Sequence, residues 1–356
     1  MAKINLLTIH YSTSCGAIMQ TYATCKVLEE LGHEVTIINL QKKRGRTLKV
    51  LFSMIKYFNF ERFRRKYLPE RTKRMYIPDI YMIPKADYFL VGSDQVWNPQ
   101  LMGDSLIYNF LSFAPDGIPR ISYAPSFGLS DITPFLNSNL LDSIKRELNK
   151  FQSISVREDS GVSICKHLFG KNAIQVLDPT LLLSDYSSLT GNFKEKDEIA
   201  CFFIGLKHNK KTIVSIIRIL KEELNIPVTY LEATSLINGV NKYYFAPFLS
   251  PIKWLKVMKR AKFILTSSFH GVAFALLFKK QFLVFNSNEQ RIGRISSLLK
   301  ILHLENRMVT NATDLQQRKA IIHEAIDYDS VYSILNEKQI ESIDYLKKSL
   351  CGKNHC

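Results

Sequence analysis

The chain has 356 residues, of which 46% are hydrophobic and 22% charged, and its 48 Lys and Arg against 32 Asp and Glu give a formal net charge of +16. This length predicts two domains, and the composition excludes wholesale disorder, a collagen-like chain and a disulfide scaffold. Six cysteines without a CxxC pair favour reduced thiols. The first apolar run is too short for a signal peptide, and polar residues interrupt the apolar stretch at 263–278, so we expect a soluble, cytoplasmic protein.

The opening residues predict a βαβ unit. Hydrophobic periodicity indicates a strand over residues 3–9, a helix over 16–31 and a second strand over 34–40. Gly16 stands at the start of this helix, where backbone amides can receive an anion. The candidate acceptor-binding residues at this junction are Cys15, Gly16 and Gln20.

A strongly basic segment follows at residues 41–85. It holds fourteen Lys and Arg against three acidic residues, so it carries 14 − 3 = +11 of the net charge. Its apolar residues recur mostly at three- and four-residue steps, which indicates an amphipathic basic helix or helix pair. Residues 41–74 suit an anionic membrane surface or nucleic acid, and the lack of a nucleic-acid-binding motif favours the peripheral membrane interpretation. A solvated insertion packed on its own domain is an equally weighted alternative.

The rest of the chain alternates strands and helices in two series. In the first series, strands are predicted at residues 88–91, 120–123, 153–156 and 173–177, and helices at 138–151 and 160–169. A break rich in Pro, Ser, Thr and Gly at 178–192 marks the domain boundary. In the second series, strands are predicted at 199–204, 228–231, 262–266 and 282–285, and helices at 211–224, 252–260, 272–278 and 291–301.

This pattern predicts an α/β protein with two Rossmann-like parallel-sheet domains facing a cleft. The N-terminal α/β domain is expected at residues 1–185 with the basic insertion at 41–85, the C-terminal α/β domain at 193–327, and a helical tail at 328–356. Ligands of such sheets bind at the carboxyl ends of the strands. The residues at those ends are therefore the candidates for function.

Polar side chains gather directly after the strand at 88–91. They can hold sugar hydroxyls or a proton, although helix capping is the alternative for the carboxylate among them. These residues are Ser93, Asp94, Gln95 and Asn98.

Arginines stand at two other junctions. Arg157 follows the strand at 153–156, where its guanidinium can bind a carboxylate or phosphate, or else pair with a neighbouring acid on the surface. Arg291 and Arg294 are one helical turn apart and can both face one anion.

His270 lies between a strand and a helix, after two serines, and this placement favours proton transfer over a purely structural role. Signatures of P-loop proteins, simple Rossmann dehydrogenases and α/β-hydrolases are missing from the sequence, and so are metal-ligand spacings such as HExxH. The candidate site is thus metal-free and made of cations, hydroxyls and one histidine.

Seven ordered segments resemble the polysaccharide pyruvyl transferase family. They are CGAIMQTYATCKVLEELG (15–32), ADYFLVGSDQVWNP (86–99), SYAPSFG (122–128), SVREDSG (155–161), VLDPTLLL (176–183), TSSFHG (266–271) and RIGRISSLLKILHLENR (291–307). The resemblance implies a glycosyltransferase-B-like fold, with the acceptor side in the N-terminal domain and the donor side in the C-terminal one. It also implies transfer of a pyruvyl group from phosphoenolpyruvate onto two hydroxyls of one sugar, which forms a cyclic ketal and releases phosphate. Phosphoenolpyruvate is then a co-substrate, and no cofactor is required.

The matching motifs also suggest roles for individual residues of this chain. The resemblance implies that His270 is the donor-site histidine and Arg157 the donor-binding arginine, and we predict that Asp94 orients or deprotonates the acceptor. The sequence departs from better-characterised members at Ser268, where they have an arginine. The charge missing there is expected from Arg291, Arg294 or Lys207.

The acceptor is expected to be a polysaccharide precursor, as in capsule or exopolysaccharide synthesis, carried on a polyprenyl diphosphate at the inner membrane face. Two alternatives stay open. One is a nucleotide-sugar glycosyltransferase of the same architecture, because a fold does not fix a reaction. The other is a non-catalytic member that binds glycan or membrane.

Overall fold

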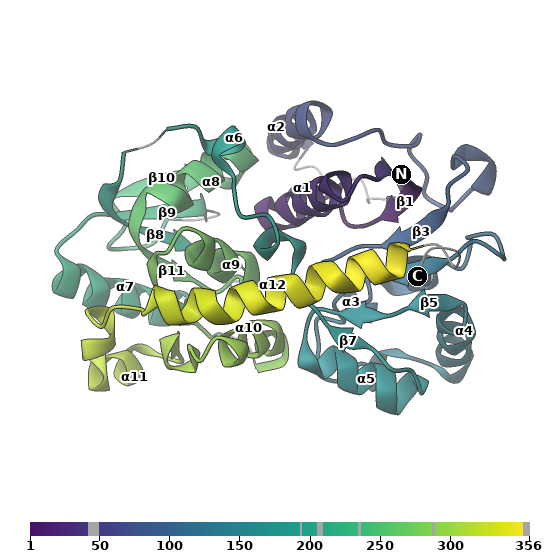
Figure 1. The fold of residues 1–356 in the computed structure, drawn as a ribbon. Coiled ribbons are helices and arrows are strands. Elements are labelled where there is room, and N and C mark those ends of the chain that lie inside the picture. The colour runs from purple at the N-terminus through teal and green to yellow at the C-terminus, as the bar shows by residue number, and fades with distance from the viewer. Residues whose placement is uncertain (42–49, 193, 205–208, 234–235, 287–288, 352–356) are drawn as a thin grey trace. The chain divides into compact units, whose positions relative to one another are not determined.

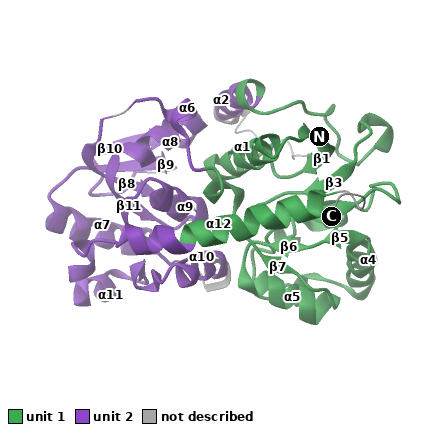
Figure 2. Ribbon diagram, viewed as in Figure 1, with its two compact units in different colours: residues 1–46, 65–183, 335–356 green, residues 47–64, 184–334 purple. Residues whose placement is uncertain are grey.

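The computed structural model describes residues 1–41, 50–192, 194–204, 209–233, 236–286 and 289–351 (Figure 1). The chain divides into two units (Figure 2). Unit 1 comprises residues 1–46, 65–183 and 335–356, and unit 2 comprises residues 47–64 and 184–334. In the described part of the chain, no helix has the length and hydropathy needed to cross a membrane.

Unit 1 contains a five-stranded parallel sheet in the order β2-β1-β3-β4-β5 and a two-stranded parallel pair, β6-β7. Its strands are β1 (Lys3–Leu7), β2 (Glu34–Ile37), β3 (Tyr88–Val91), β4 (Arg120–Ser122), β5 (Phe151–Ser153), β6 (Ser155–Val156) and β7 (Ile174–Gln175). Its helices include α1 (Cys15–Glu30), α3 (Pro99–Met102), α4 (Ser138–Leu148) and α5 (Asp159–Phe169).

Both faces of this sheet are buried. Along β3 all four residues are buried: Phe89 and Val91 pack in one hydrophobic cluster, while Tyr88 and Leu90 pack in another. Because side chains alternate between the faces of a strand, the two clusters lie on opposite sides of the sheet. A continuous apolar run such as YFLV is what a parallel strand covered on both faces requires.

Unit 2 contains a six-stranded parallel sheet in the order β10-β9-β8-β11-β12-β13. Its strands are β8 (Lys196–Phe202), β9 (Val228–Ala233), β10 (Lys242–Phe245), β11 (Ala261–Thr266), β12 (Gln281–Phe285) and β13 (Met308–Val309). Its helices include α6 (Ser187–Thr190), α7 (Lys210–Leu224), α8 (Pro251–Arg260), α9 (Phe269–Leu277), α10 (Glu289–Ile301) and α11 (Ala312–Gln317). The predicted class, α/β with two parallel-sheet domains, is confirmed.

Several predicted elements have different ends in the structure. The helix expected at 138–151 ends at Leu148, because the chain turns there and enters β5. The helix expected at 272–278 begins at Phe269, so His270 lies inside its first turn. The sequence did not predict β10 or β13, since β10 is a partly exposed edge strand with an irregular register and β13 has only two residues.

In the described part of the basic segment, residues 41 and 50–85, there is one α-helix, α2 (Val50–Tyr67). Residues up to Arg64 group with unit 2, and Phe60, Phe63 and Arg64 are buried. After the helix the chain runs beside β2, where Arg71 and Met75 form bridges with residues of that edge. Residues 42–49, which include five of the predicted cations, lie outside the described part of the chain.

The last helix, α12 (Tyr328–Leu350), contributes to both units. In unit 2, Tyr332 donates a hydrogen bond to the carbonyl of Leu276 at 3.2 Å. In unit 1, Tyr345 donates to the carbonyl of Ser122 at 2.9 Å. Of the tail predicted at 328–356, residues 328–350 form one continuous helix whose two ends belong to different units, and residues 352–356 lie outside the described part of the chain.

Candidate functional site

The strand order of unit 1 reverses between β1 and β3, which are neighbours in the sheet although β2 lies between them in sequence. Open parallel sheets bind ligands at such a switch point, beyond the carboxyl ends of the strands. Thr8 follows β1 and Ser93 follows β3, and the Thr8 hydroxyl donates to the Ser93 carbonyl at 3.0 Å. Gln20 of α1 donates to the same Thr8 hydroxyl at 3.0 Å. These contacts fix the loop after β3, which carries Asp94.

Arg157 lies in the interior of this junction, surrounded by carboxylates. Its Nη1 is 2.8 Å from Asp178 Oδ2, its Nε is 3.8 Å from Glu158 Oε2, and its Nη2 is 4.0 Å from Asp94 Oδ1. Burial disfavours the charge of this guanidinium, but Asp178, Glu158 and Asp94 outweigh that penalty and raise the pKa of Arg157. Only 1% of the side chain is exposed. The arginine thus neutralises a buried acidic cluster instead of pairing on the surface, and direct contact with a donor anion stays a prediction.

Asp94 is the member of this cluster that reaches the surface, with 12% of its side chain exposed. Its φ of 74° lies in the left-handed region, which is unfavourable for a residue other than glycine. The loop holds it there through a hydrogen bond from the Ser126 amide to the Asp94 carbonyl, at 2.8 Å. Capping, the alternative considered for Asp94, is done by Asn98, whose Oδ1 accepts from the amides of Gln100 and Leu101 at the start of α3.

The other predicted acceptor residues are committed to contacts inside unit 1. Ser93 is fully buried and donates to Asp178 Oδ2 at 2.8 Å, and Gln95 accepts from Asn98 at 2.8 Å. Cys15 and Gly16 are buried in the first turn of α1, and Gln20 is buried as well. These residues support the loop geometry, and their contact with a sugar stays a prediction.

Two carboxylates that organise this region, Asp178 and Glu158, were not among the predicted site residues; an acid next to Arg157 was considered only as a partner on the surface. Asp178 accepts from Ser93, Arg157 and Thr180, and Glu158 Oε1 accepts from the Ser126 hydroxyl at 2.7 Å. Both stand in segments that matched the family, VLDPTLLL and SVREDSG. The available signal was an acidic residue two or three positions after the end of a strand, as at Asp94.

A pocket of about 570 Å³ opens at the carboxyl end of β1. Its lining combines three tyrosines with hydroxyl, amide and carboxylate groups, which are the groups that can stack on a sugar ring and bind its hydroxyls. The lining residues are Leu7, Thr8, Ile9, Tyr11, Leu40, Gln41, Tyr76, Ile77, Met102, Gly103, Asp104, Ser105, Tyr108 and Asn109. Thr8 connects this pocket to the loop that carries Asp94.

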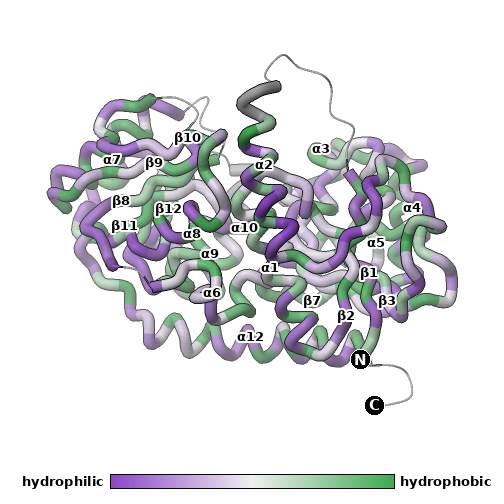
Figure 3. Tube along the Cα trace, turned by 90° about the horizontal axis from the view of Figure 1, so that it is seen from above, coloured by the Kyte–Doolittle hydropathy of each residue, from purple (hydrophilic) through white to green (hydrophobic). Residues whose placement is uncertain are grey.

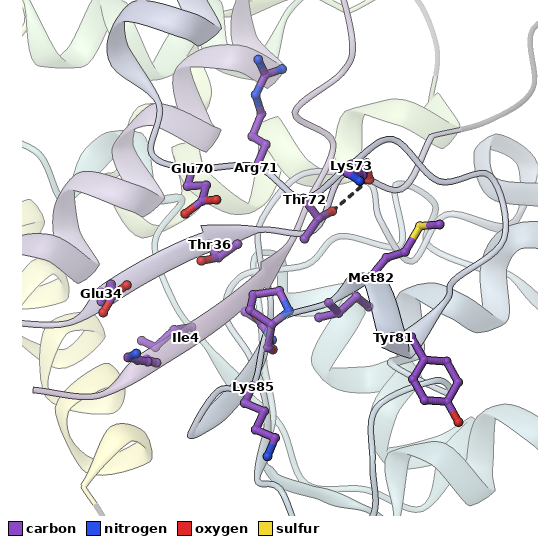
Figure 4. A pocket seen from close by; sticks show the side chains of 14 residues that line it. Ile4, Glu34, Thr36, Glu70, Arg71, Thr72, Lys73, Tyr81, Met82 and Lys85 are labelled. Atoms are coloured by element: carbon purple, nitrogen blue, oxygen red, sulfur yellow. Dashed lines mark hydrogen bonds between the residues drawn. The ribbon is translucent and has the colours of Figure 1, made fainter.

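A second pocket of unit 1, of about 540 Å³, lies at the other end of the strands (Figure 4). It is lined by residues from the beginnings of β1 and β2, including Ile4 and Glu34, and by later residues such as Glu70, Lys73 and Tyr81. Its lining mixes both signs of charge. Because ligands of parallel sheets bind at the carboxyl ends, we place the candidate site at the first pocket.

The strand order of unit 2 reverses between β8 and β11, and the predicted histidine stands there. The Thr266 hydroxyl donates to the Phe202 carbonyl at 2.6 Å, and the Ser267 hydroxyl accepts from the Ile204 amide at 3.0 Å. These bonds join the ends of the two strands. His270, 6% exposed, follows in the first turn of α9, where backbone amides have no acceptor within the helix and attract negative charge.

Gly271 allows α9 to begin this close to β11. A Cβ at this position would lie 2.1 Å from Thr266 Oγ1 and 2.8 Å from Thr266 Cβ, closer than atoms can approach. The glycine therefore sets the distance between the strand end and the helix that carries His270. A larger residue at this position of the TSSFHG segment would clash with Thr266.

The structure places the predicted donor-binding residues of unit 2 in different surroundings. Ser268 is the N-cap residue of α9 and is 2% exposed. Arg294 is partly buried in α10, and Arg291 lies in the first turn of the same helix, at a position where only the backbone is described. Lys207 lies outside the described residues.

Asp94 and Arg157 belong to unit 1, and His270 with Ser268 belongs to unit 2. Asp94 and Arg157 lie near the switch point of the unit 1 sheet, and Ser268 and His270 lie at that of the unit 2 sheet. Each group is therefore described as a candidate site of its own unit.

Comparison with known proteins gives information on the fold and on the family of the chain. The structure resembles an S. aureus MnaA–UDP complex with a TM-score of 0.56 and 14% identity over 98% of this chain and 97% of that one. It also resembles a putative UDP-N-acetylglucosamine 2-epimerase from Listeria monocytogenes (TM-score 0.55, 11% identity, 98% and 95% coverage) and Arabidopsis thaliana UGT89C1 complexed with quercetin (TM-score 0.53, 9% identity, 99% and 100% coverage). At these identities the likeness concerns the fold, which is glycosyltransferase-B-like.

Among curated protein sequences, none matches this chain. The family model described as polysaccharide pyruvyl transferase matches residues 15–289, from the first helix of unit 1 to the start of α10 in unit 2. That range includes both switch points and the predicted residues Asp94, Arg157 and His270. The chain therefore belongs to the polysaccharide pyruvyl transferase family.

Proposed function

We propose that this protein transfers the pyruvyl group of phosphoenolpyruvate onto two hydroxyls of one sugar, forms a cyclic ketal and releases phosphate. The observation that carries the proposal is His270 in the first turn of α9, at the switch point of unit 2, in a chain of this family. A histidine next to a helix amino terminus can transfer a proton beside a bound anion. Phosphoenolpyruvate supplies such an anion and also the carbon that must be protonated.

The donor binds to unit 2 in this proposal. The first-turn amides of α9 attract its phosphate or carboxylate, and Arg294, Arg291 and Lys207 supply positive charge that an arginine at position 268 would otherwise give. His270 protonates carbon 3 of the enol group. No resident cofactor is needed, because side chains can provide the proton and the charge stabilisation.

The acceptor binds to unit 1. Its sugar ring occupies the pocket of about 570 Å³, and Asp94 orients or deprotonates the attacking hydroxyl. Arg157 is a positioning residue here, since it holds the buried acidic cluster from which Asp94 extends. Lipid linkage of the acceptor through a polyprenyl diphosphate is part of the proposal.

The chemical steps balance without an external oxidant or reductant. Protonation of carbon 3 develops positive charge at carbon 2, and the first sugar hydroxyl attacks this carbon and loses its proton. The bond from carbon 2 to the phosphate oxygen then breaks and phosphate leaves. Attack by the second hydroxyl closes the ketal ring and releases another proton.

The test is incubation of the full chain with phosphoenolpyruvate and a panel of lipid-linked and soluble sugars. We expect acceptor-dependent release of phosphate and a product with the mass of a pyruvyl ketal. A parallel incubation with nucleotide sugars tests the alternative glycosyltransferase activity. Release of nucleoside diphosphate there, with no phosphate release from phosphoenolpyruvate, contradicts the proposal.

Thermal unfolding with phosphoenolpyruvate alone provides a second readout. A ligand that binds the folded state raises the melting temperature even when the right acceptor is missing. We expect this rise in the wild-type protein. Its absence at saturating phosphoenolpyruvate favours a non-catalytic member.

A further inference from the structure

Helix α2 has an exposed apolar face in addition to its buried one. Met54 and Phe58 are four residues apart, hence on the same side of the helix, and they are 58% and 70% exposed. Arg62 is exposed one turn further along the same side. Figure 3 shows the change from hydrophobic turns near the amino end of α2 to hydrophilic turns near its carboxyl end.

Contacts on the other side of α2 anchor it within unit 2. Lys56 Nζ lies 3.0 Å from Glu232 Oε1, and Asn59 Nδ2 donates to the Pro247 carbonyl at 3.3 Å. Phe60 is fully buried. The helix therefore packs on unit 2 through its buried side. Met54 and Phe58 take no part in this packing, so their exposure needs another explanation.

A neighbouring segment of unit 2 extends the apolar surface. Phe248, in the 3₁₀ helix η6 (Ala246–Phe248), is 55% exposed, and Phe245 before it is 40% exposed. Phe58 and Phe248 are the chain neighbours of the hydrogen-bonded pair Asn59 and Pro247, so the exposed residues of the two segments lie close together.

Two lysines gather at Tyr244, the residue before Phe245. Lys242 and Lys253 both stand over the Tyr244 ring, 5.1 Å and 4.7 Å from its centroid. The acids of α2 and β9, Glu61 and Glu232, are paired with Arg64 and Lys56. Among the described residues of these segments, an excess of positive charge remains. We call the set Met54, Phe58, Arg62, Lys242, Phe245, Phe248 and Lys253 the α2–η6 face.

We propose that the α2–η6 face docks on the surface of a bilayer containing anionic phospholipid. The Met and Phe side chains enter the boundary between headgroups and acyl chains, while the Lys and Arg side chains bind the negative headgroups. An apolar patch of this kind is unfavourable in water and marks an interaction surface. Nucleic acid would bind the cations but would not require the apolar Met54 and Phe58.

This proposal differs from the sequence-based one, which assigned the whole segment 41–74 to the membrane. Lys56 pairs with Glu232 of unit 2 and Arg64 is buried, so neither belongs to the docking face. Residues of η6 and β10 take part although they lie far away in sequence. It is independent of the donor chemistry, because docking requires neither phosphoenolpyruvate nor a sugar.

The experiment is co-sedimentation of the full chain with vesicles of pure phosphatidylcholine or of phosphatidylcholine with about one third phosphatidylglycerol. We expect binding to the anionic vesicles and a decrease in high salt. The double variant Met54→Ser/Phe58→Ser and the single variant Phe248→Ser are each expected to lower the partition coefficient at least about tenfold. Arg62→Gln is expected to lower it about fivefold.

Matched controls keep the test specific. Ile340→Ser removes an apolar side chain that is 64% exposed on α12, and Lys166→Gln removes an exposed cation of α5; both should bind vesicles like wild type. Each variant must keep the wild-type melting temperature. Folded variants of the α2–η6 face with unchanged vesicle binding overturn the proposal. It is also overturned if these residues control binding of a single-stranded oligonucleotide, or self-association, while wild type does not bind vesicles.

Discussion

A histidine in the first turn of a helix lies beside amide groups that have no acceptor in that helix. His270 has this position in α9, and its side chain is enclosed enough to exclude most water while 6% remains accessible. Negative charge at this end of the helix is favourable by about 0.3–1 kcal/mol when exposed and more when partly buried. In the function proposed here, these amides take the place of an arginine at position 268 in attracting the bound anion.

Replacing this histidine tests its role as the acid. His270→Ala is expected to lower kcat about 10²- to 10⁴-fold, which is the usual contribution of general acid catalysis, with a smaller change in KM for the acceptor. The measurement is phosphate release from phosphoenolpyruvate with a saturating acceptor. His167→Ala removes an exposed histidine of α5 and should have full activity. Wild-type turnover in His270→Ala would exclude the catalytic role.

The stability of unit 1 depends on Arg157, because this one buried cation balances several carboxylates. Arg157→Met leaves Asp178, Glu158 and Asp94 without it, and removal of one partner of a buried ion pair costs about 3–5 kcal/mol. Urea unfolding should show this loss. Because the loss of stability comes from uncompensated negative charge, the additional substitution Asp178→Asn should restore part of the lost free energy of unfolding. If the double variant is as unstable as the sum of its single variants, the cluster does not act as a unit.

At the scale of elements, strands and helices with a clear hydrophobic period were predictable. The run at 88–91 is an example, since β3 has these bounds. The position of Asp178 beside Arg157 was not predictable, because it depends on the pairing of β6 with β7, in which Val156 faces Gln175. Neither strand is longer than two residues, so their pairing leaves no periodic pattern in the sequence.

The junction between β11 and α9 leads to a prediction about two glycines. Gly271→Ala should move the start of α9 away from Thr266, because its Cβ would lie 2.1 Å from Oγ1, and should reduce both stability and donor binding. Gly161→Ala in α5 is the matched control, since its nearest contact is 3.1 Å, to Val156 Cβ. Thermal unfolding with and without phosphoenolpyruvate measures both effects. Equal stability and equal donor-induced stabilisation in the two variants would mean that the close approach at Gly271 has no functional effect.

At the scale of the whole molecule, α12 connects the stability of both units to one segment. Its later residues complete unit 1: Tyr88 donates to the Leu350 carbonyl at 3.1 Å, and Tyr345 and Leu346 belong to the core on one side of the sheet. Its earlier residues bind unit 2, as Tyr332 shows. The later part of the helix is thus a component of the unit 1 core, and its earlier part is hydrogen-bonded to α9 of unit 2.

Removing residues 335–356 should destabilise unit 1 selectively. Hydrogen exchange followed by mass spectrometry is expected to show faster exchange in β3 and β4, where Tyr345 and Leu350 make their contacts, than in β11 and β12. Tyr332→Phe is the reciprocal variant and should affect α9 of unit 2 and not β4. Unchanged exchange in β3 and β4 after the truncation would show that these contacts contribute little.

The same helix has a consequence for biosynthesis. During translation, domains usually fold in the order in which they leave the ribosome. Here the residues that complete the core of unit 1, Tyr345, Leu346 and Leu350, are synthesised after all of unit 2. The second unit can thus reach its native packing while the first still exposes apolar surface at β1, β3 and β4. The nascent chain needs protection from aggregation at its first-made unit, until the ribosome has added α12.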